Sequence, residues 1–179
     1  MKICNICKKS FETKNSLAKC CGYDCAIIYA RNQQQKVIDK NHIKFKKEGL
    51  EKLKTKSVYL KEVQKIFNQY IRLRDKDSGC ISCGNISNVK FDAGHFYSVG
   101  AYPNLRFNED NVHKQCSNYC NVNLSGNIHE YIPRLIQKIG QQRFDELEAK
   151  KGVKAHYSIE DLKELKEIYK NKIKQYAYN

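Results

Sequence analysis

The cysteines constrain this chain more than any other residue type, because eight of the nine fall into four close pairs. The pairs are Cys4/Cys7, Cys21/Cys25, Cys80/Cys83 and Cys116/Cys120. Two close pairs separated by an intervening span are typical of a tetrahedral zinc site with four thiolate ligands. The sequence therefore predicts two structural zinc ions, one near the N-terminus and one in the middle of the chain. Cys20 adjoins Cys21, and spacing alone does not decide which of the two is a ligand.

A chain of 179 residues is long enough for one domain with a modest core, or for two small domains. It contains no apolar run close to the ~18 residues that span a bilayer. Its first residues show no charged-then-apolar signal pattern. We therefore expect a soluble, cytoplasmic protein with no membrane partner, in which paired cysteines bind metal rather than form disulfides.

The formal net charge is +14, and much of it lies in one segment. Residues 31–76 contain 14 Lys and Arg but only 5 Asp and Glu, a net +9. A basic stripe of this kind favours a polyanionic partner, most often a nucleic acid. The alternatives are a solvated helix face that is merely basic, and a membrane-surface helix, which the lack of a wide apolar face disfavours.

The pattern along the chain predicts three parts. Residues 1–27 form a zinc knuckle, which is too short to bury a core and would gain its folding free energy from the metal. Residues 28–56 are polar, basic and free of proline, which favours an exposed helical linker. Residues 57–179 form the main domain. It begins with a helix whose apolar stripe is Tyr59, Val63, Phe67 and Tyr70, and it ends with a helix that starts near Ser158. Shorter helices are expected near 130–139 and 141–150.

Five polar residues lie between the two central cysteine pairs or directly after the second of them: Asp92, His95, Asn111, His113 and Asn121. An imidazole such as that of His95 can take a proton from water near neutral pH. Asp92 and Asn121 offer the oxygen ligands that Mg²⁺ prefers. Asn111 or His113 would orient the base or supply a further ligand. The alternative is that all of these side chains only hydrogen-bond the turns of a zinc ribbon.

These residues resemble a known family. A CxxC pair, a histidine-bearing strand, Asn111 five residues before the second pair, and Asn121 directly after it resemble a four-cysteine HNH endonuclease. More closely, the strings DAGHFYSVGAYPNLRFNEDNVHKQC and CNVNLSGN are similar to the NinG/Rap family of lambdoid phage recombination nucleases. The resemblance extends to the N-terminal knuckle and the basic linker, so it covers most of the chain.

The resemblance implies an α+β fold with a zinc-stapled ββα-metal (HNH-like) core flanked by helices. It implies that His95 activates water, that Asn111 orients this histidine or holds its loop, and that Asn121 binds the catalytic ion. Gly94 stands where many HNH enzymes have an Asp or His ligand. Asp92 or His113 is therefore expected to substitute for that ligand.

The function expected from these observations is a metal-dependent DNA endonuclease that hydrolyses phosphodiesters with Mg²⁺ or another divalent ion. The family implies branched substrates, such as D-loops and Holliday junctions, in the bacterial host of a phage. The expected DNA contacts are Arg72, Arg74, Lys76 and Lys114. A homodimer through the last helix and phage recombination proteins are further partners to consider. The alternative function is a non-catalytic zinc-finger DNA-binding accessory protein, which needs neither His95 nor magnesium.

Overall fold

The computed structural model describes residues 1–87 and 89–177. The chain divides into two compact units, Met1–Lys54 and Thr55–Asn179. The structure is a mixed α and β fold that is mostly helical, and the described residues form two small antiparallel sheets of two strands each. None of the described helices combines the length and apolar character that crossing a membrane requires.

The first unit is a short hairpin followed by one long helix. Strands β1 (Lys2–Ile3) and β2 (Ser10–Phe11) pair with each other, and α1 spans Tyr23–Lys52. This helix covers most of the range predicted to be helical, because its sequence lacks proline and contains only one glycine, Gly49. None of its 30 residues is buried. Its stability therefore rests on intrinsic propensity and local pairs rather than on packing.

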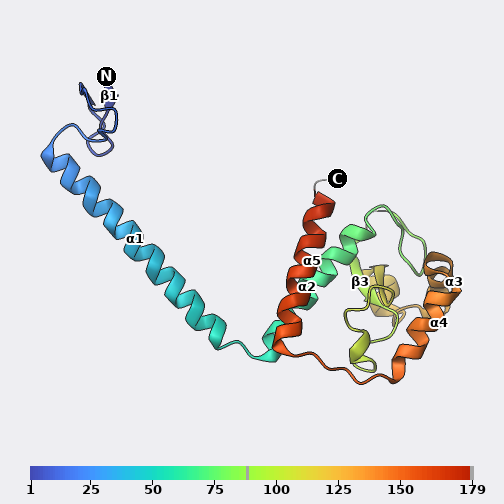
Figure 1. Cartoon of the computed structure of the whole chain (residues 1–179). Helices are drawn as coiled ribbons and strands as arrows, with labels where there is room; N and C mark the ends of the chain where they lie inside the picture. The colour runs from blue at the N-terminus through green and yellow to red at the C-terminus, as the bar shows by residue number, and fades with distance from the viewer. Residues whose placement is uncertain (88, 178–179) are drawn as a thin grey trace. The chain divides into compact units, whose positions relative to one another are not determined.

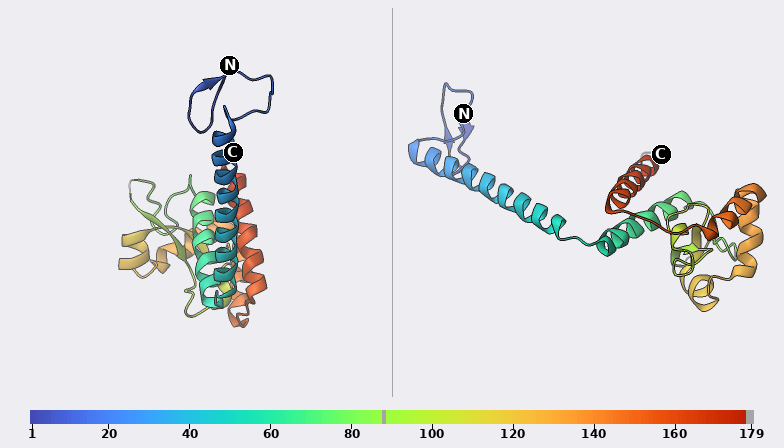
Figure 2. Two further views of the ribbon diagram at one scale, coloured as in Figure 1. Left: turned by 90° about the vertical axis from the view of Figure 1, so that its left-hand side faces the viewer. Right: turned by 60° about the horizontal axis from the view of Figure 1, so that its bottom comes forward.

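The second unit begins and ends with two helices that pack side by side, α2 (Lys56–Arg74) and α5 (Ile159–Ala177) (Figure 1 and Figure 2). The predicted apolar stripe of the first helix is confirmed, since Tyr59, Val63, Phe67 and Tyr70 are all buried in one core. Helix α5 adds Leu162 and Tyr169 to this core. The ring centroids of Phe67 and Tyr169 are 4.8 Å apart in an edge-on arrangement.

A hairpin of β3 (Phe91–His95) and β4 (Val112–Cys116) lies against these helices. The register runs from Phe91 opposite Cys116 to His95 opposite Val112. Because side chains alternate between the faces of a sheet, the face that carries His95 also carries Ala93 and Val112. Ala93 and Val112 pack into the α2–α5 core. The opposite face carries Asp92, Gly94, His113 and Gln115.

The segment after the hairpin covers that opposite face. A π-helical segment, η2 (Ser117–Asn123), leads to α3 (Ile128–Ile139), α4 (Gln141–Ala149) and the 3-10 turn η3 (Lys150–Gly152). A second core forms here from Phe96, Leu105, Tyr131, Leu135 and Leu147, and Leu105 belongs to the short turn η1 (Pro103–Leu105). The hairpin is thus the middle layer, with α2 and α5 on one face and α3 on the other.

Helix α3 begins earlier than the sequence predicts. A start near residue 130 would place Pro133 in the first turn, but the observed start at Ile128 places the proline in the second turn. The earlier start brings the partly buried Ile128 against the second core. Pro133 is exposed, so water can solvate the carbonyl that loses its helical partner. The end is as predicted, at Gly140 with a φ of 84°.

Candidate functional site

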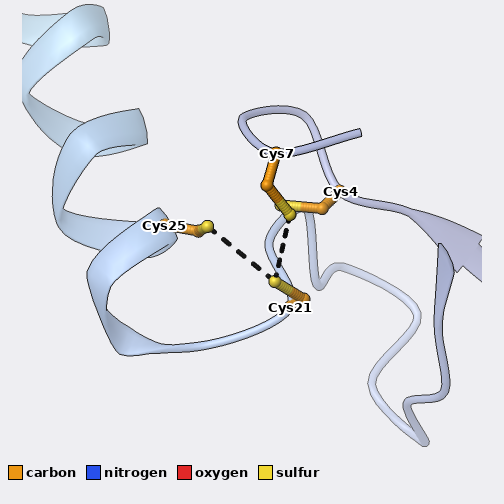
Figure 3. Close-up of side chains that lie close together, drawn as sticks. All are labelled: Cys4, Cys7, Cys21 and Cys25. Atoms are coloured by element: carbon orange, nitrogen blue, oxygen red, sulfur yellow. Dashed lines mark hydrogen bonds between the residues drawn. The ribbon is translucent and has the colours of Figure 1, made fainter. Parts of the chain in front are cut away.

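The N-terminal tetrad brings together Cys4, Cys7, Cys21 and Cys25, whose sulfurs face one another across the knuckle (Figure 3). The Sγ atoms of Cys7 and Cys21 are 3.5 Å apart, and those of Cys21 and Cys25 are 3.8 Å apart. A disulfide would require about 2.05 Å, whereas four sulfurs at ~2.3 Å from one zinc lie about 3.8 Å from each other. The donor set therefore fits zinc, with Cys21 rather than Cys20 as the ligand.

The second tetrad joins three segments of the main unit, and its members are Cys80, Cys83, Cys116 and Cys120. The sulfurs of Cys83 and Cys116 are 3.6 Å apart. The backbone N–H of Cys116 donates to the Cys80 sulfur at 3.3 Å, and the Asn127 amide donates to the Cys120 sulfur at 3.8 Å. Such bonds stabilise thiolates. The two tetrads could each hold a zinc ion, and this second one would fix the end of the hairpin to η2.

His95 is the last residue of β3 and is half-buried. Its Nε2 atom lies 3.0 Å from the backbone oxygen of Arg106. A carbonyl oxygen only accepts hydrogen bonds, so Nε2 carries the proton and the neutral ring leaves Nδ1 as the acceptor. Burial lowers the pKa of His95, and the nearby charge of Arg106 acts in the same direction. The ring is therefore held neutral and oriented, as a general base must be.

Asn111 fixes the loop that orients His95. It is fully buried, directly before β4. Its Oδ1 accepts from the N–H of Tyr97 at 2.7 Å, and its Nδ2 donates to the carbonyls of Tyr97 and Leu105 at 3.0 Å each. Leu105 precedes Arg106, whose carbonyl holds the imidazole. Asn111 thus acts on His95 through the backbone, and its own side chain faces no open space.

The remaining polar residues do not gather around His95. Asp92 and His113 lie on the other face of the hairpin, and Asp92 is also about 10 Å along the strand at ~3.3 Å per residue. Among the described residues, the two cysteine tetrads are the groups of three or more potential ligands with donor atoms within 4.8 Å of one another. The geometry therefore does not support Asp92 or His113 as the substitute ligand beside His95. The role of Asn121, which lies half-buried in η2, stays a prediction.

Asp92 and His113 have other partners. The Ser117 hydroxyl donates to the Asp92 carboxylate, which ties β3 to the start of η2. The Tyr131 hydroxyl donates to the carbonyl of Gly94 at 3.2 Å, so it accepts from Nδ1 of His113 at 3.3 Å. Burial, with help from the charges of Arg74 and Lys138, lowers the pKa of His113 to about 3. His113 is thus a neutral core residue.

Gly94 leaves no room for a side chain. A Cβ atom placed there would lie 2.1 Å from Oε1 of Gln115, which fills the space that a ligand side chain would occupy. The Gln115 amide is itself fixed, because Nε2 donates to the Ser82 hydroxyl at 2.7 Å and to the Gly126 carbonyl at 2.6 Å. Among the described residues, Oε1 of Gln115 is the buried side-chain oxygen without a hydrogen-bond partner.

The structure corrects two of the predicted DNA contacts. Arg74 donates two hydrogen bonds to the Asp75 carboxylate and others to backbone carbonyls, so its guanidinium is engaged within the fold. Lys114 is buried, donates to the carbonyl of Lys76 at 2.9 Å, and lies over the ring of Phe91. The sequence did not reveal these contacts because the backbone carbonyls that accept from the two cations are distant in the chain. Arg72 and Lys76 are exposed, and their contact with DNA stays a prediction.

Sequence reasoning missed three residues that shape this region. Arg106 supplies the carbonyl for His95, and its guanidinium lies 3.4 Å from Oε1 of Gln64 in α2. Gln115 closes the space over Gly94. Arg106 and Gln115 belong to the long string that resembles the phage family, which was the one available signal for them. Gln64 carries no motif, and only the tertiary structure places it here.

Comparisons with known proteins agree with this reading of the chain as a phage protein. The family model described as "Bacteriophage Lambda NinG protein" matches residues 1–178. The protein ninG of Escherichia phage lambda is 43% identical over 122 residues, which cover 68% of this chain and 59% of that protein. The protein ninG of Salmonella phage P22 is 42% identical over 123 residues, with 68% and 59% covered. The match thus spans about six-tenths of the length of these relatives. No solved structure matches the chain. The chain belongs to the NinG family.

Proposed function

We propose that this protein is an endonuclease that hydrolyses phosphodiester bonds in DNA, with His95 as the general base. One observation carries the proposal: the imidazole is held by the Arg106 carbonyl through Nε2, at the end of a hairpin strand. An HNH-like ββα-metal core is also supported by the hairpin, by the cysteine tetrad at its other end and by the helical segment that follows. The cytoplasm of the infected bacterium is the expected site of action.

In this mechanism, Nδ1 of His95 accepts a proton from a water molecule as the water attacks phosphorus, and the bond from phosphorus to one sugar oxygen breaks, with that oxygen leaving with the electron pair. The ring can do so at neutral pH because its lowered pKa keeps it unprotonated. The proton that Nε2 donates to the Arg106 carbonyl holds the ring in the tautomer that this step requires. Arg106, whose carbonyl holds the ring, also brings a positive charge that would attract a phosphate to this end of the hairpin.

The proposal includes a divalent ion, although the proton transfer to His95 involves only the imidazole and water. Mg²⁺ would polarise the phosphate and offset charge on the leaving oxygen. The described residues place no cluster of His, Cys, Asp or Glu ligands beside His95, and Asp92 lies on the other face of the hairpin. The proposal therefore rests on the base and its orientation.

The substrate class follows from charge and family. A net charge of +14 favours a polyanion, and the resemblance to NinG/Rap nucleases implies branched recombination intermediates. If several phosphates are contacted, the affinity for DNA falls steeply with salt. An affinity independent of salt between 50 and 200 mM would contradict phosphate binding by the basic residues.

A second candidate is a zinc-stabilised DNA-binding accessory protein without nuclease activity. The observation that favours it is the separation of Asp92 and His113 from His95, which leaves the base without a nearby carboxylate ligand set. This protein would use the same tetrads and the same basic charge.

Incubation of the zinc-loaded full chain with branched and linear DNA separates the two candidates. The endonuclease is expected to cleave branched DNA with Mg²⁺ or Mn²⁺, to stop when a mild chelator removes that ion, and to lose activity about 100-fold or more in His95→Ala. His129→Ala, an exposed histidine on α3, is the matched control and should retain activity. Cleavage that survives His95→Ala would refute the mechanism, and binding without cleavage under every condition would favour the accessory protein.

A further inference from the structure

A cavity of about 570 Å³ opens beside the second tetrad, on the side of Cys83 and Cys116. We call it the Tyr119 pocket, and its other lining residues are Asn85, Val89, Lys90, Ser117, Asn118 and Tyr119. Its volume lies within the range of small-molecule sites, roughly 300–1,000 Å³. It lies at the end of the hairpin opposite His95, about 13 Å away along a strand that rises ~3.3 Å per residue. The pocket is thus separate from the general base.

The lining combines an aromatic ring, two amides and a cation. The side chain of Tyr119 is exposed, with a relative accessibility of 61%, and Val89 adds apolar surface at 44%. Asn85 lines the pocket, and its Oδ1 accepts from the N–H and the hydroxyl of Ser87, so its Nδ2 is the group that would donate to a bound molecule. Asn118 and Lys90 are exposed, and no hydrogen bond or ion pair of their side chains is found in the part of the chain that the structure describes.

The pocket is built on fixed elements. Ser117 begins η2, its N–H donates to the carbonyl of Lys90 at 2.9 Å, and its hydroxyl donates to Asp92. Cys116 and Cys120, on either side of Tyr119, belong to the tetrad. The backbone that carries Tyr119 is therefore held by the tetrad and by the hairpin, so the segment itself needs little ordering on binding.

This chemistry fits a nucleobase better than other occupants. An exposed aromatic face stacks on any base, asparagine amides bond the edges of an unpaired base, and a lysine at the rim pairs with its phosphate. A hydrophobic peptide would leave both amides and the lysine without partners. In a duplex the base edges are already paired, so only an unpaired or displaced base can enter.

We propose that the Tyr119 pocket binds one unpaired nucleobase of DNA, stacked on Tyr119 with its phosphate near Lys90. This proposal rests on the proposed DNA substrate, and it gives a physical reason for a preference for branched over paired DNA. The pocket would recognise a base that a junction or a displaced strand leaves unpaired, while His95 acts at the far end of the hairpin.

The test uses the zinc-loaded full chain carrying His95→Ala, so that binding is measured without cleavage. The probes are a duplex with one bulged 2-aminopurine and the same duplex with that 2-aminopurine paired. We expect a change in fluorescence on binding the bulged duplex and none on binding the paired one. Tyr119→Ala should weaken affinity for the bulged duplex about tenfold and leave the paired duplex unchanged, whereas Tyr119→Phe should retain the affinity.

Val122→Ala is the matched control, because Val122 lies exposed on the same η2 segment outside the pocket lining. Zinc content must equal that of the parent for each variant. An equal loss for both duplexes in Tyr119→Ala, or no loss for either, would overturn the proposal. The two proposals can fail separately. If binding of the bulged duplex depends on Tyr119 but the parent chain does not cleave DNA, only the nuclease proposal is refuted. If cleavage depends on His95 but Tyr119→Ala does not change binding of the bulged duplex, only the pocket proposal is refuted.

Discussion

Asp75 is a buried carboxylate that contacts three different elements of the main unit. It is 3% exposed, at the C-terminal end of α2. Its carboxylate accepts two hydrogen bonds from Arg74, one from Lys138 at 2.8 Å, and one from the backbone N–H of Lys114 at 3.1 Å. Burial alone would raise the pKa of Asp75, but the bonds and charges of Arg74 and Lys138 outweigh it and hold the pKa well below its usual value. The carboxylate thus joins α2, β4 and α3.

Asp75→Asn is expected to destabilise the main unit by about 3 kcal/mol, the lower end of the range for breaking a buried pair, since water partly screens Lys138. The loss follows because Arg74 keeps a half-buried charge without its partner. Urea denaturation at pH 7 measures it. Asp77→Asn, two residues along and exposed, should stay within about 0.5 kcal/mol of the parent. Equal effects of the two changes would contradict the role of Asp75.

His113 should make stability depend on pH. Its pKa falls from 6.5 to about 3 on folding, so between these values the unfolded chain binds the extra proton. Its contribution is fully present above pH 6.5 and is lost as pH falls. From pH 7 to 5 this costs about 2 kcal/mol, at 1.36 kcal/mol per pKa unit.

Urea denaturation of the zinc-loaded protein at pH 7 and at pH 5 measures this dependence. His113→Gln should flatten the difference between the two pH values, while His129→Gln, an exposed control, should leave it unchanged. A pH dependence that persists in His113→Gln would assign it to other groups.

At the scale of the elements, the hairpin shows what sequence could and could not predict. The paired cysteines predicted both tetrads, because thiolate ligands must converge whatever the intervening chain does. The three- and four-residue spacing of Tyr59, Val63, Phe67 and Tyr70 predicted a buried helix face. The start of α5 near Ser158 was also predicted, and there the N–H of Ser158 donates to the Asp161 carboxylate and the N–H of Asp161 donates to the Ser158 hydroxyl.

The register of the hairpin could not be predicted in the same way. A five-residue strand has two faces, and the pairing of His95 with Val112 decides which residues share one. Sequence placed Asp92 and His95 in one site because both lie between the central cysteine pairs and Asp92 offers an oxygen ligand, but their separation of three residues directs them to opposite faces of the strand. The backbone carbonyls to which Arg74 and Lys114 donate lie more than thirty residues away, so sequence could not show these contacts either.

The loop between the hairpin strands depends on Asn111. Asn111→Ala removes three hydrogen bonds and takes these partners from the N–H and carbonyl of Tyr97, while the Leu105 carbonyl keeps the N–H of Asn108. We expect a loss of about 3 kcal/mol in the free energy of unfolding, at about 1 kcal/mol per bond. Hydrogen exchange should show the amide of Tyr97 losing protection. Asn123→Ala, an exposed residue of η2, should change neither quantity, and a protected Tyr97 amide in Asn111→Ala would contradict the assignment.

At the scale of the whole molecule, each of the two compact units contains one cysteine tetrad and has its own internal contacts. The N-terminal tetrad holds the knuckle to the start of α1, since Cys25 is in the first turn of that helix. The second tetrad holds the CxxC turn to the hairpin and η2. Stability of the two units should therefore respond separately to loss of a ligand.

Metal analysis of the full chain is expected to give two zinc ions. Cys7→Ser should lower this to one and leave unfolding of the main unit within about 0.5 kcal/mol of the parent, because all its contacts remain. Cys83→Ser should also leave one zinc, but it should destabilise the main unit by several kcal/mol, as removal of structural zinc does. Loss of both ions in either variant would contradict independent sites.

The exposure of helix α1 determines how freely its length can change by insertion or deletion. Since none of its 30 side chains is buried, no packing fixes its number of residues. Four more residues would add about 6 Å of helix, at 1.5 Å each, and would cost neither core a contact. The length of this segment is therefore free to drift under mutation, whereas a single added residue in β3 would turn every following side chain of that strand to the other face.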